Sequence, residues 1–576
     1  MPIPYDLQKE FLNNPEYKHY FALYQGDIMS DFINYPEYII TIVNNEYKAA
    51  IISFKANLEL TFGDPRFPSL VFIKYRELYT LQQISPIEAA GIESLQLGTV
   101  LNLTGKGVIV GIIDTGIDYL CKEFRFPSGE TRINFIWDQT ILPQSNTIKN
   151  NFSIPFGSTY SMDDINKAIN DSELGLDPYL TVPSKDDIGH GTKMATIIGG
   201  NGSVLGTPGV APNCSFVIVK LLESLDIKEQ FKVDTPIFTL PVIFTALQFL
   251  YDYSINNKVP IMIYLPLGTN SGNHKGGALL EQFIDYISIT PGIVVITGAG
   301  NEGAYGCHAS GILRSISDSG LIYLSVSPNQ SFLEVEIWIE TPDIMTVDVI
   351  SPAGESSSFT PVSVSSETSY NFIFEKTTID LVYSIPDGNS GDELIRINFT
   401  NLQAGIWKLR LTPRLFLSGR YNVWITFPGE LIKDTYFAPS DPFGTITIPG
   451  TSASIITVAA YNQNNNNLLL YSGNALYYEY IDRIDLAAGG VNAPTVAPAN
   501  KITVANGTSV SAAIATGACA LIAEWSLLNL SIKFPYSNMI KFYLLLGTVR
   551  RSGDVYPNNQ WGYGMLNVVN IFKTLS

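Results

Sequence analysis

Four short stretches, far apart in the chain, carry side chains that could together attack a carbonyl group. They contain Asp114 in DTG, His190 in GHGT, Asn301 in AGNEG and Ser509 in GTS. An aspartate that orients a histidine, a histidine that takes a proton and a serine that attacks are the parts of nucleophilic catalysis. An asparagine amide in a glycine-rich turn can donate to a developing oxyanion. The four stretches predict acyl transfer.

Each stretch alone also has an ordinary structural explanation. A serine at the start of an alanine-rich helix can simply cap that helix, which is worth about 1 kcal/mol, and Thr508 or Ser511 could cap it as well as Ser509. His190, between two glycines and ahead of a helix expected from Thr192 onward, could be a structural histidine. A lone Asn301 could be a turn residue. Only the combination is specific.

A second protease class also fits part of the pattern. The DTG at Asp114 could pair with the DSG at Asp318, because two aspartates that share a proton can activate water. That chemistry is expected in an all-β fold, whereas Asp114 follows a run typical of a buried parallel strand. We therefore interpret Asp318 as an ordinary turn aspartate.

The elements that must position these residues are near-continuous apolar runs. VIVGIIDTG, SFVIVKLL, VPIMIYLPLG and GIVVITGAG end in glycine-rich turns and alternate with helix-length stretches. Unbroken Val/Ile runs of this kind are typical of parallel strands buried on both faces. They predict a doubly wound α/β sheet, in which active sites gather at the carboxyl ends of the strands.

The pattern changes twice along the chain. Residues 1–83 predict a small α+β domain, whereas strict alternation over 312–447 predicts an all-β sandwich of jelly-roll type. Buried-strand runs resume afterwards. We therefore expect one α/β catalytic domain, formed by 84–311 and 448–576, into which the sandwich is inserted.

Composition narrows the function classes. The chain has 35 basic and 53 acidic residues, a net charge of −18 that disfavours nucleic acid and anionic membranes as partners. We expect neither a secretory signal nor a membrane span. The four cysteines are scattered, and His274 and His308 lie in glycine-rich turns without a carboxylate pair nearby, so we expect no metal and no cofactor.

The order Asp, His, Ser with these motifs resembles the subtilisin-like serine proteases. The resemblance implies that Asp114 orients His190, that His190 is the general base, that Ser509 is the nucleophile and that Asn301 completes the oxyanion hole. It also implies that Leu267 and Gly268 bind substrate. The chain departs from the family's usual residues at three positions, namely Pro266, Lys193 and Ala513.

Further features resemble the germination-specific Csp proteases of clostridial spores. These are TRINFIWDQT between the aspartate and histidine motifs, LQQISPIEAAGI ahead of the first catalytic strand, and the inserted sandwich. The resemblance implies a prodomain that is cut off near Leu81, Gln82 or Gln83 and stays bound. It also implies a spore location, the precursor of a cortex-lytic enzyme as substrate, and related Csp proteins as possible partners.

Two other functions remain alternatives. Some Csp proteins have lost catalytic residues and act as signalling pseudoproteases, so a silent sensor or regulator is the main competitor of an active endopeptidase. We expect activity because Asp114, His190 and Ser509 are all present. A general degradative subtilisin would need secretion, which the expected lack of a signal peptide disfavours.

Overall fold

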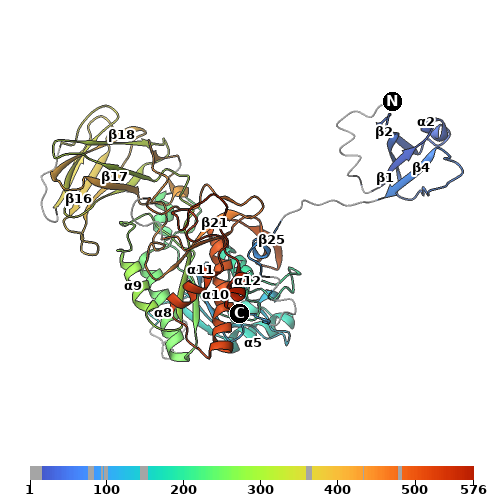
Figure 1. Cartoon of the computed structure of the whole chain (residues 1–576), viewed down its shortest axis with the longest axis horizontal. Helices are drawn as coiled ribbons and strands as arrows, with labels where there is room; N and C mark the ends of the chain where they lie inside the picture. Colours follow the sequence, from blue (N-terminus) through green and yellow to red (C-terminus); the bar gives the residue numbers. More distant parts are fainter. Residues whose placement is uncertain are drawn as a thin grey trace. The chain divides into compact units, whose positions relative to one another are not determined.

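The computed structural model divides the chain into two units, Met1–Gln83 and Ile84–Ser576, which we describe separately (Figure 1). The predicted cleavage region at Leu81, Gln82 and Gln83 lies outside the residues that the structure describes. Those described are 14, 16–75, 84–92, 95, 101–142, 154–231, 233–358, 366–432, 434–477 and 483–575.

The first unit contains a four-stranded antiparallel sheet in the order β2-β3-β1-β4. One face of the sheet, together with a short helix, encloses an aromatic core in which Phe32 and Phe67 stack at 4.0 Å between ring centroids. The elements are β1 (Tyr17–Tyr24), α2 (Ile28–Phe32), β2 (Tyr38–Asn44), β3 (Ala49–Lys55) and β4 (Leu70–Tyr75).

The second unit is built around a mainly parallel sheet, as the apolar runs predict. Its order is β22-β21-β10-β9-β5-β8-β6-β7, with β23 beside β21; only the β6–β7 and β21–β22 pairs are antiparallel. Its strands are β5 (Ile109–Asp114), β6 (Ile133–Asp138), β7 (Ser158–Ser161), β8 (Ser215–Lys220), β9 (Ile261–Tyr264), β10 (Ile293–Gly298), β21 (Ile456–Asn462), β22 (Asn467–Leu468) and β23 (Leu486–Gly489).

Helices cover both faces of this sheet. Along β5, Val110 and Ile112 pack into the core under α6 and α10, whereas Ile109 and Ile113 pack under α8 and α9 (green in Figure 1). The helices are α3 (Pro86–Ala89), α5 (Met162–Glu173), α6 (His190–Gly199), α7 (Leu225–Phe231), α8 (Leu240–Asn257), α9 (Leu279–Ser288), α10 (Thr508–Leu530), α11 (Ser537–Leu546) and α12 (Val568–Leu575).

Helix α10 runs through the core of the second unit. Among the described helices it alone is long and apolar enough to cross a membrane by length and composition, yet 94% of its most apolar stretch is buried within the protein. Its small residues allow this close packing, as at Gly517, where an added Cβ would lie 2.4 Å from Val210. The helix is therefore the central core helix of a folded domain.

Two antiparallel sheets form a sandwich, and residues of both sheets share one hydrophobic core. Their orders are β11-β19-β13-β17-β16-β15 and β14-β18-β12-β20. In the sequence, the sandwich lies between the two parts of the α/β region. The first strand of the sandwich begins at His308, whereas the sequence predicts that the sandwich starts at residue 312. The strands are β11 (His308–Ile312), β12 (Gly320–Val326), β13 (Phe332–Ile339), β14 (Ile344–Ile350), β15 (Ser366–Asn371), β16 (Thr378–Ser384), β17 (Glu393–Thr400), β18 (Gly405–Leu415), β19 (Arg420–Ile425) and β20 (Tyr436–Phe437).

The sandwich is joined to the loop that follows β9 by a buried carboxylate. Glu336 of β13, 1% exposed, accepts hydrogen bonds from Ser271 Oγ (2.9 Å) and from the Gly272 N–H (2.8 Å) of that loop. Within the sandwich it also accepts from Arg396 Nη2 (2.9 Å) and from Trp338 Nε1 (3.0 Å). The four donors converge on one charge, which connects the two parts of this unit.

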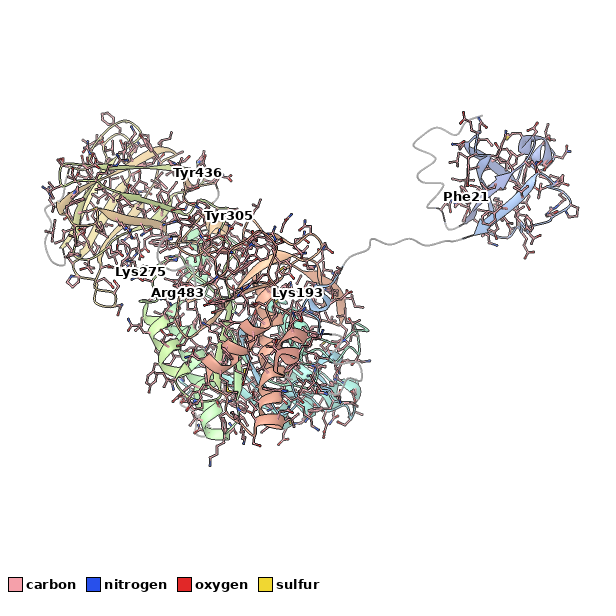
Figure 2. The ribbon with its side chains drawn as sticks, viewed as in Figure 1. Phe21, Lys193, Lys275, Tyr305, Tyr436 and Arg483 are labelled. Carbon is pink, nitrogen blue, oxygen red and sulfur yellow. The ribbon has the colours of Figure 1, made fainter. Side chains whose placement is uncertain are left out.

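A second link at this junction is an ion pair. Lys275 (labelled in Figure 2) lies 2.8 Å from a carboxylate oxygen of Glu340 and 3.5 Å from one of Asp392. The Glu340 side chain is 27% exposed, so water screens this pair. The Glu336 cluster should therefore contribute more to the stability of the junction.

We expect Glu336→Gln to lower the free energy of unfolding by about 1 to 3 kcal/mol, because the new NH₂ group must face donors on whichever side it lies. Denaturant unfolding measures this change. The matched control Glu340→Gln should cost less than about 1 kcal/mol. Equal losses in the two variants would contradict the role given to Glu336.

Candidate active site

The structure brings Asp114 and His190 together at the carboxyl end of the central strand β5. Asp114 is the last residue of β5 and is 2% exposed, and His190 is the first residue of α6. His190 Nδ1 lies 2.9 Å from Oδ1 and 2.8 Å from Oδ2 of the carboxylate. Since Nδ1 donates to Asp114, Nε2 of a neutral ring is left as the basic nitrogen.

Two glycines let the histidine approach the strand this closely. Gly189 has φ +78°, a left-handed conformation that side chains disfavour, and α6 starts directly after it, two residues earlier than predicted. A Cβ on Gly191 would lie 2.1 Å from the Gly116 carbonyl oxygen. The GHG sequence thus has a steric reason as well as a chemical one.

A buried carboxylate that we did not single out from the sequence fixes the start of α6. Asp186 Oδ1 accepts from Thr115 Oγ1 and from the Gly189 N–H, both at 2.8 Å. Its Oδ2 accepts from the N–H and the hydroxyl of Thr192, at 2.8 and 2.6 Å. The sequence signal was available: an acidic residue just ahead of a helix start satisfies the free N–H groups there.

The charge of Asp114 controls the protonation of His190. Burial alone would lower the pKa of His190, but the nearby negative charge of Asp114 and its hydrogen bond outweigh burial, and the pKa lies above its ordinary value. Lys193, one helical turn along, lowers the pKa by a smaller amount. The ring is therefore suited to hold a proton taken from a nucleophile.

Ser509 is the second residue of α10 and is partly exposed. Gly507 is the N-cap of this helix, with no side-chain capping bond, and the Ser511 hydroxyl donates to the Ala488 carbonyl at 3.0 Å. The capping explanation for Ser509 thus finds no support. In the described part of the chain no hydrogen bond joins Ser509 Oγ to His190. The distance between a catalytic serine and its histidine is often long before substrate binds.

A buried tyrosine holds the backbone of Ser509. Tyr264, the last residue of β9, is fully buried and donates its hydroxyl hydrogen to the Ser509 carbonyl at 3.0 Å. Burial, together with the charge of Asp114, raises its pKa well above the ordinary value, so it remains a neutral donor. The contact fixes the first turn of α10 against the strand ends.

Asn301 follows β10 and faces the same helix start. Its Oδ1 lies 3.2 Å from the Thr508 backbone nitrogen and 3.1 Å from the Thr508 hydroxyl. Because the backbone N–H can only donate, the atom facing it must be the amide oxygen. The Asn301 Nδ2 group is then left to donate to a ligand beside Ser509.

The remaining predicted residues fall into two groups. Leu267 and Gly268 follow β9; Gly268 is exposed and Leu267 partly so, as an edge that pairs with a peptide requires. Asp318 lies in the turn between β11 and β12, where its carboxylate accepts from the Arg314 and Ser319 N–H groups. Asp318 is thus held in a turn, as predicted.

His274 and His308 are both buried and stack on the ring of Trp424, with ring centroids 4.2 and 4.5 Å away. His274 Nδ1 is 2.7 Å from the Ile446 carbonyl oxygen, and burial lowers the pKa of its ring to about 4. These contacts join the sandwich to the α/β part. In the described residues no group of three or more His, Cys, Asp or Glu side chains could hold a metal ion.

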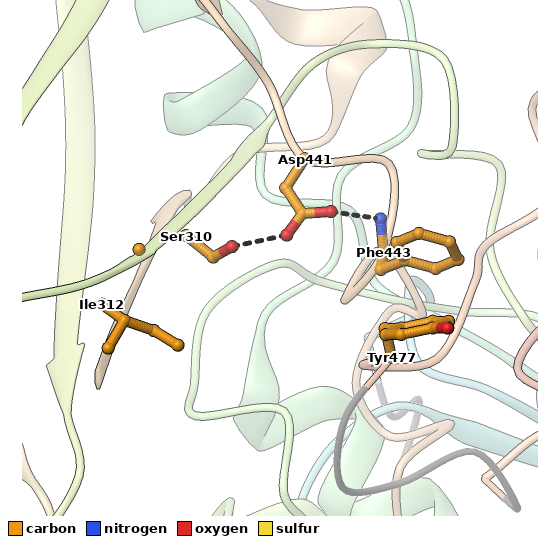
Figure 3. Close-up of a pocket in the computed structure, with 6 residues that line it drawn as sticks. Ser310, Ile312, Asp441, Phe443 and Tyr477 are labelled. Carbon is orange, nitrogen blue, oxygen red and sulfur yellow. Dashed lines mark hydrogen bonds between the residues drawn. The ribbon is translucent and has the colours of Figure 1, made fainter. Parts of the chain in front are cut away.

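A cavity of about 270 Å³ lies near the start of the sandwich (Figure 3). Ser310 donates to Asp441 at 2.5 Å, and Asp441 accepts from the Phe443 N–H at 2.9 Å. The rings of Phe443 and Tyr477 lie beside this pair. None of the four residues of the predicted site lines the cavity, so it is separate from that site.

Fold and site together define a subtilisin-like arrangement, and the comparisons agree. The subtilase family (Peptidase_S8) model matches residues 105–378 and 440–564, more than half of the chain and including Asp114, His190, Asn301 and Ser509. The chain belongs to the subtilase family. It is a subtilisin-like serine protease with an α/β subtilisin-like fold.

Among solved structures, the chain is similar to the CspB protease of Clostridium perfringens, with a TM-score of 0.74 and 27% identity over 85% of this chain and 96% of that one. This agrees with the predicted Csp resemblance. A serine-to-alanine mutant of the PatA protease domain matches at a TM-score of 0.40 and 13% identity, over 82% of this chain and 97% of that one. No curated protein matches the sequence.

We expect the peptidase activity to rise with pH through an apparent pKa above about 6.5, the ordinary value of histidine. A raised pKa keeps His190 protonated, and unable to accept a proton, up to a higher pH. The pH profile of kcat/KM measures this apparent pKa. A midpoint below about 6.5 would contradict the dominance of Asp114 over burial.

We expect Asn301→Ala to lower kcat by about 10² to 10³ with little change in KM, because the Nδ2 donor acts on charge that develops only during the reaction. Steady-state kinetics on a peptide substrate measure both constants. The control Asn270→Ala removes a buried amide after β9 that donates to Glu302 instead. A loss confined to KM would contradict an oxyanion role for Asn301.

Proposed function

We propose that the protein is an endopeptidase in which Ser509 attacks the scissile carbonyl. His190 takes the Ser509 hydroxyl proton at Nε2 and returns it to the leaving amine, while Asp114 holds the imidazolium that forms. Asn301 Nδ2 and the Ser509 N–H donate to the oxyanion. One observation above all supports this mechanism: His190 Nδ1 contacts both oxygens of the buried Asp114 carboxylate.

The reaction proceeds in two steps, acylation and deacylation of Ser509. In the first, the Oγ–C bond forms, the peptide C–N bond breaks and the amine leaves with the transferred proton. In the second, water attacks the acyl-serine and His190 takes a proton from it; the Oγ–C bond then breaks, His190 returns the proton to Ser509 Oγ, and the acid is released. No cofactor enters either step.

We further propose that the first substrate is the chain itself. The compact unit Met1–Gln83 would be a prodomain, removed by cleavage near Leu81, Gln82 or Gln83 and retained without a covalent bond. The boundary between the two compact units coincides with this region, which supports a cut that leaves both folded.

The physiological substrate that we propose is the precursor of a spore-cortex hydrolase, which limited proteolysis would activate during germination in the spore. Similarity to a Clostridium perfringens CspB protease supports this assignment. The net charge of −18 disfavours acidic polymers as ligands and is compatible with a protein substrate. A silent, sensor-type Csp protein is the alternative that the following experiment tests.

We expect the purified wild-type chain to lose its N-terminal unit and Ser509→Ala to stay full length, because peptidase activity should fall by about six orders of magnitude without the nucleophile. Intact mass and N-terminal sequencing measure the cut. Ser511→Ala is the matched control, two residues along the same helix, and should still process.

Labelling by a fluorophosphonate, which reacts with an activated serine, gives an independent readout. The wild type and Ser511→Ala should be labelled and Ser509→Ala should not. A wild-type chain that stays full length and unlabelled would support the silent alternative. Processing of Ser509→Ala at the wild-type rate would assign the cut to another group.

A further inference from the structure

Helix α10 must place Ser509 within reach of His190, although the two residues are held by different strands of the main sheet. His190 is bound to the end of β5 through Asp114, whereas hydrogen bonds to the first turn of α10 come from residues in or just after β9, β10 and β23. In the sheet, β9 lies between β5 and β10, and β23 pairs with β21 on the far side of β10. Of these three contacts, the one from β9 is therefore the nearest to the end of β5.

On the side of β10 and β23 the start of the helix is packed closely against the sheet. A Cβ on Gly298, the last residue of β10, would lie 2.8 Å from Thr508 Cβ and 2.8 Å from the Thr508 carbonyl oxygen. The helix thus rests directly on this glycine. The Ser511 hydroxyl donates to the carbonyl of Ala488 in β23 at 3.0 Å. These contacts hold the helix on strands that lie farther from β5 than β9 does.

The contact from β9 is the Tyr264 hydroxyl, which donates to the Ser509 carbonyl at 3.0 Å. Tyr264 pairs with Ile112 in the register of β9 and β5, and both side chains pack in the core under α6 and α10. Asp114, two residues along β5 from Ile112, points to the same face of the sheet. The tyrosine ring therefore stands next to the strand end that carries Asp114, as a rigid spacer between β9 and the backbone of Ser509.

We propose that Tyr264 is a positioning residue: its hydroxyl holds the Ser509 backbone at the height above the sheet from which Ser509 Oγ reaches His190 Nε2. The proposal rests on the proposed function, since it assumes attack by Ser509. Because Tyr264 is fully buried, it is out of reach of a substrate. It should therefore act on the rate of attack and not on substrate binding.

The test is Tyr264→Phe, which removes only the hydroxyl. On a peptide p-nitroanilide we expect kcat to fall by about 10- to 100-fold with KM unchanged, since a small misplacement of a reacting group can cost about 10²-fold. The rate of labelling by a fluorophosphonate should fall by the same factor, because this reagent also requires attack by Ser509. The midpoint of the pH profile of kcat/KM should stay at the wild-type value, because Asp114 and His190 keep their contact.

Tyr119→Phe is the matched control. Tyr119 is also buried, and its hydroxyl also donates to a backbone carbonyl, that of Val182, at 2.8 Å. The two variants should lose similar amounts of stability in denaturant unfolding, whereas Tyr264→Phe alone should lose activity. Equal losses of kcat in the two variants would show a general structural effect and would overturn the proposal.

Three further results for Tyr264→Phe would also overturn it. These are an unchanged kcat, a loss confined to KM, and a shifted pH midpoint, which would mean that the hydroxyl acts on the charge of Asp114 instead. The wild type separates failure of this inference from failure of the proposed function. An active, labelled wild type beside an equally active Tyr264→Phe disproves only the role of Tyr264, whereas a wild type that neither cleaves the peptide nor is labelled disproves the proposed function itself.

Discussion

The buried carboxylate of Asp114 is the constraint on which the site depends. A charge at the end of a central, fully buried strand is costly unless it is paired and hydrogen-bonded. His190 supplies the partner, and the ring reaches the carboxylate only because α6 begins at that residue with glycines on either side. Asp186 then satisfies the first N–H groups of the helix. Asp186 thus fixes where the helix starts, and Asp114 fixes how its first side chain points.

The other half of the site depends on the start of α10. Its first turn is held from two strands, by the Tyr264 hydroxyl at the end of β9 and by the Asn301 amide after β10. These contacts hold the first turn of α10 at the carboxyl ends of β9 and β10. Because the strands are parallel, their carboxyl ends meet at one edge, and residues from distant parts of the chain can act together.

Local pattern was sufficient to predict the central strands β5, β8, β9 and β10 and the residues at their ends, since buried parallel strands produce unbroken apolar runs. It was not sufficient for contacts between distant segments. The stacking of His274 and His308 on Trp424 joins a loop, β11 and β19, and nothing near either histidine indicates it. Asp186 differs, because its position before a helix start was visible and its importance was overlooked.

The buried Glu336 cluster makes the inserted sandwich part of the protease rather than an appended module. The loop it holds follows directly on the edge at Leu267 and Gly268, so a local opening of the sandwich would also release that edge. Proteins usually open in cooperative units. We expect the sandwich and the edge that is predicted to bind substrate to open as one such unit, because the Glu336 hydrogen bonds join the sandwich to the loop after this edge. A molecule that binds the far side of the sandwich could therefore alter the protease through the stability of this unit, without touching the cleavage site.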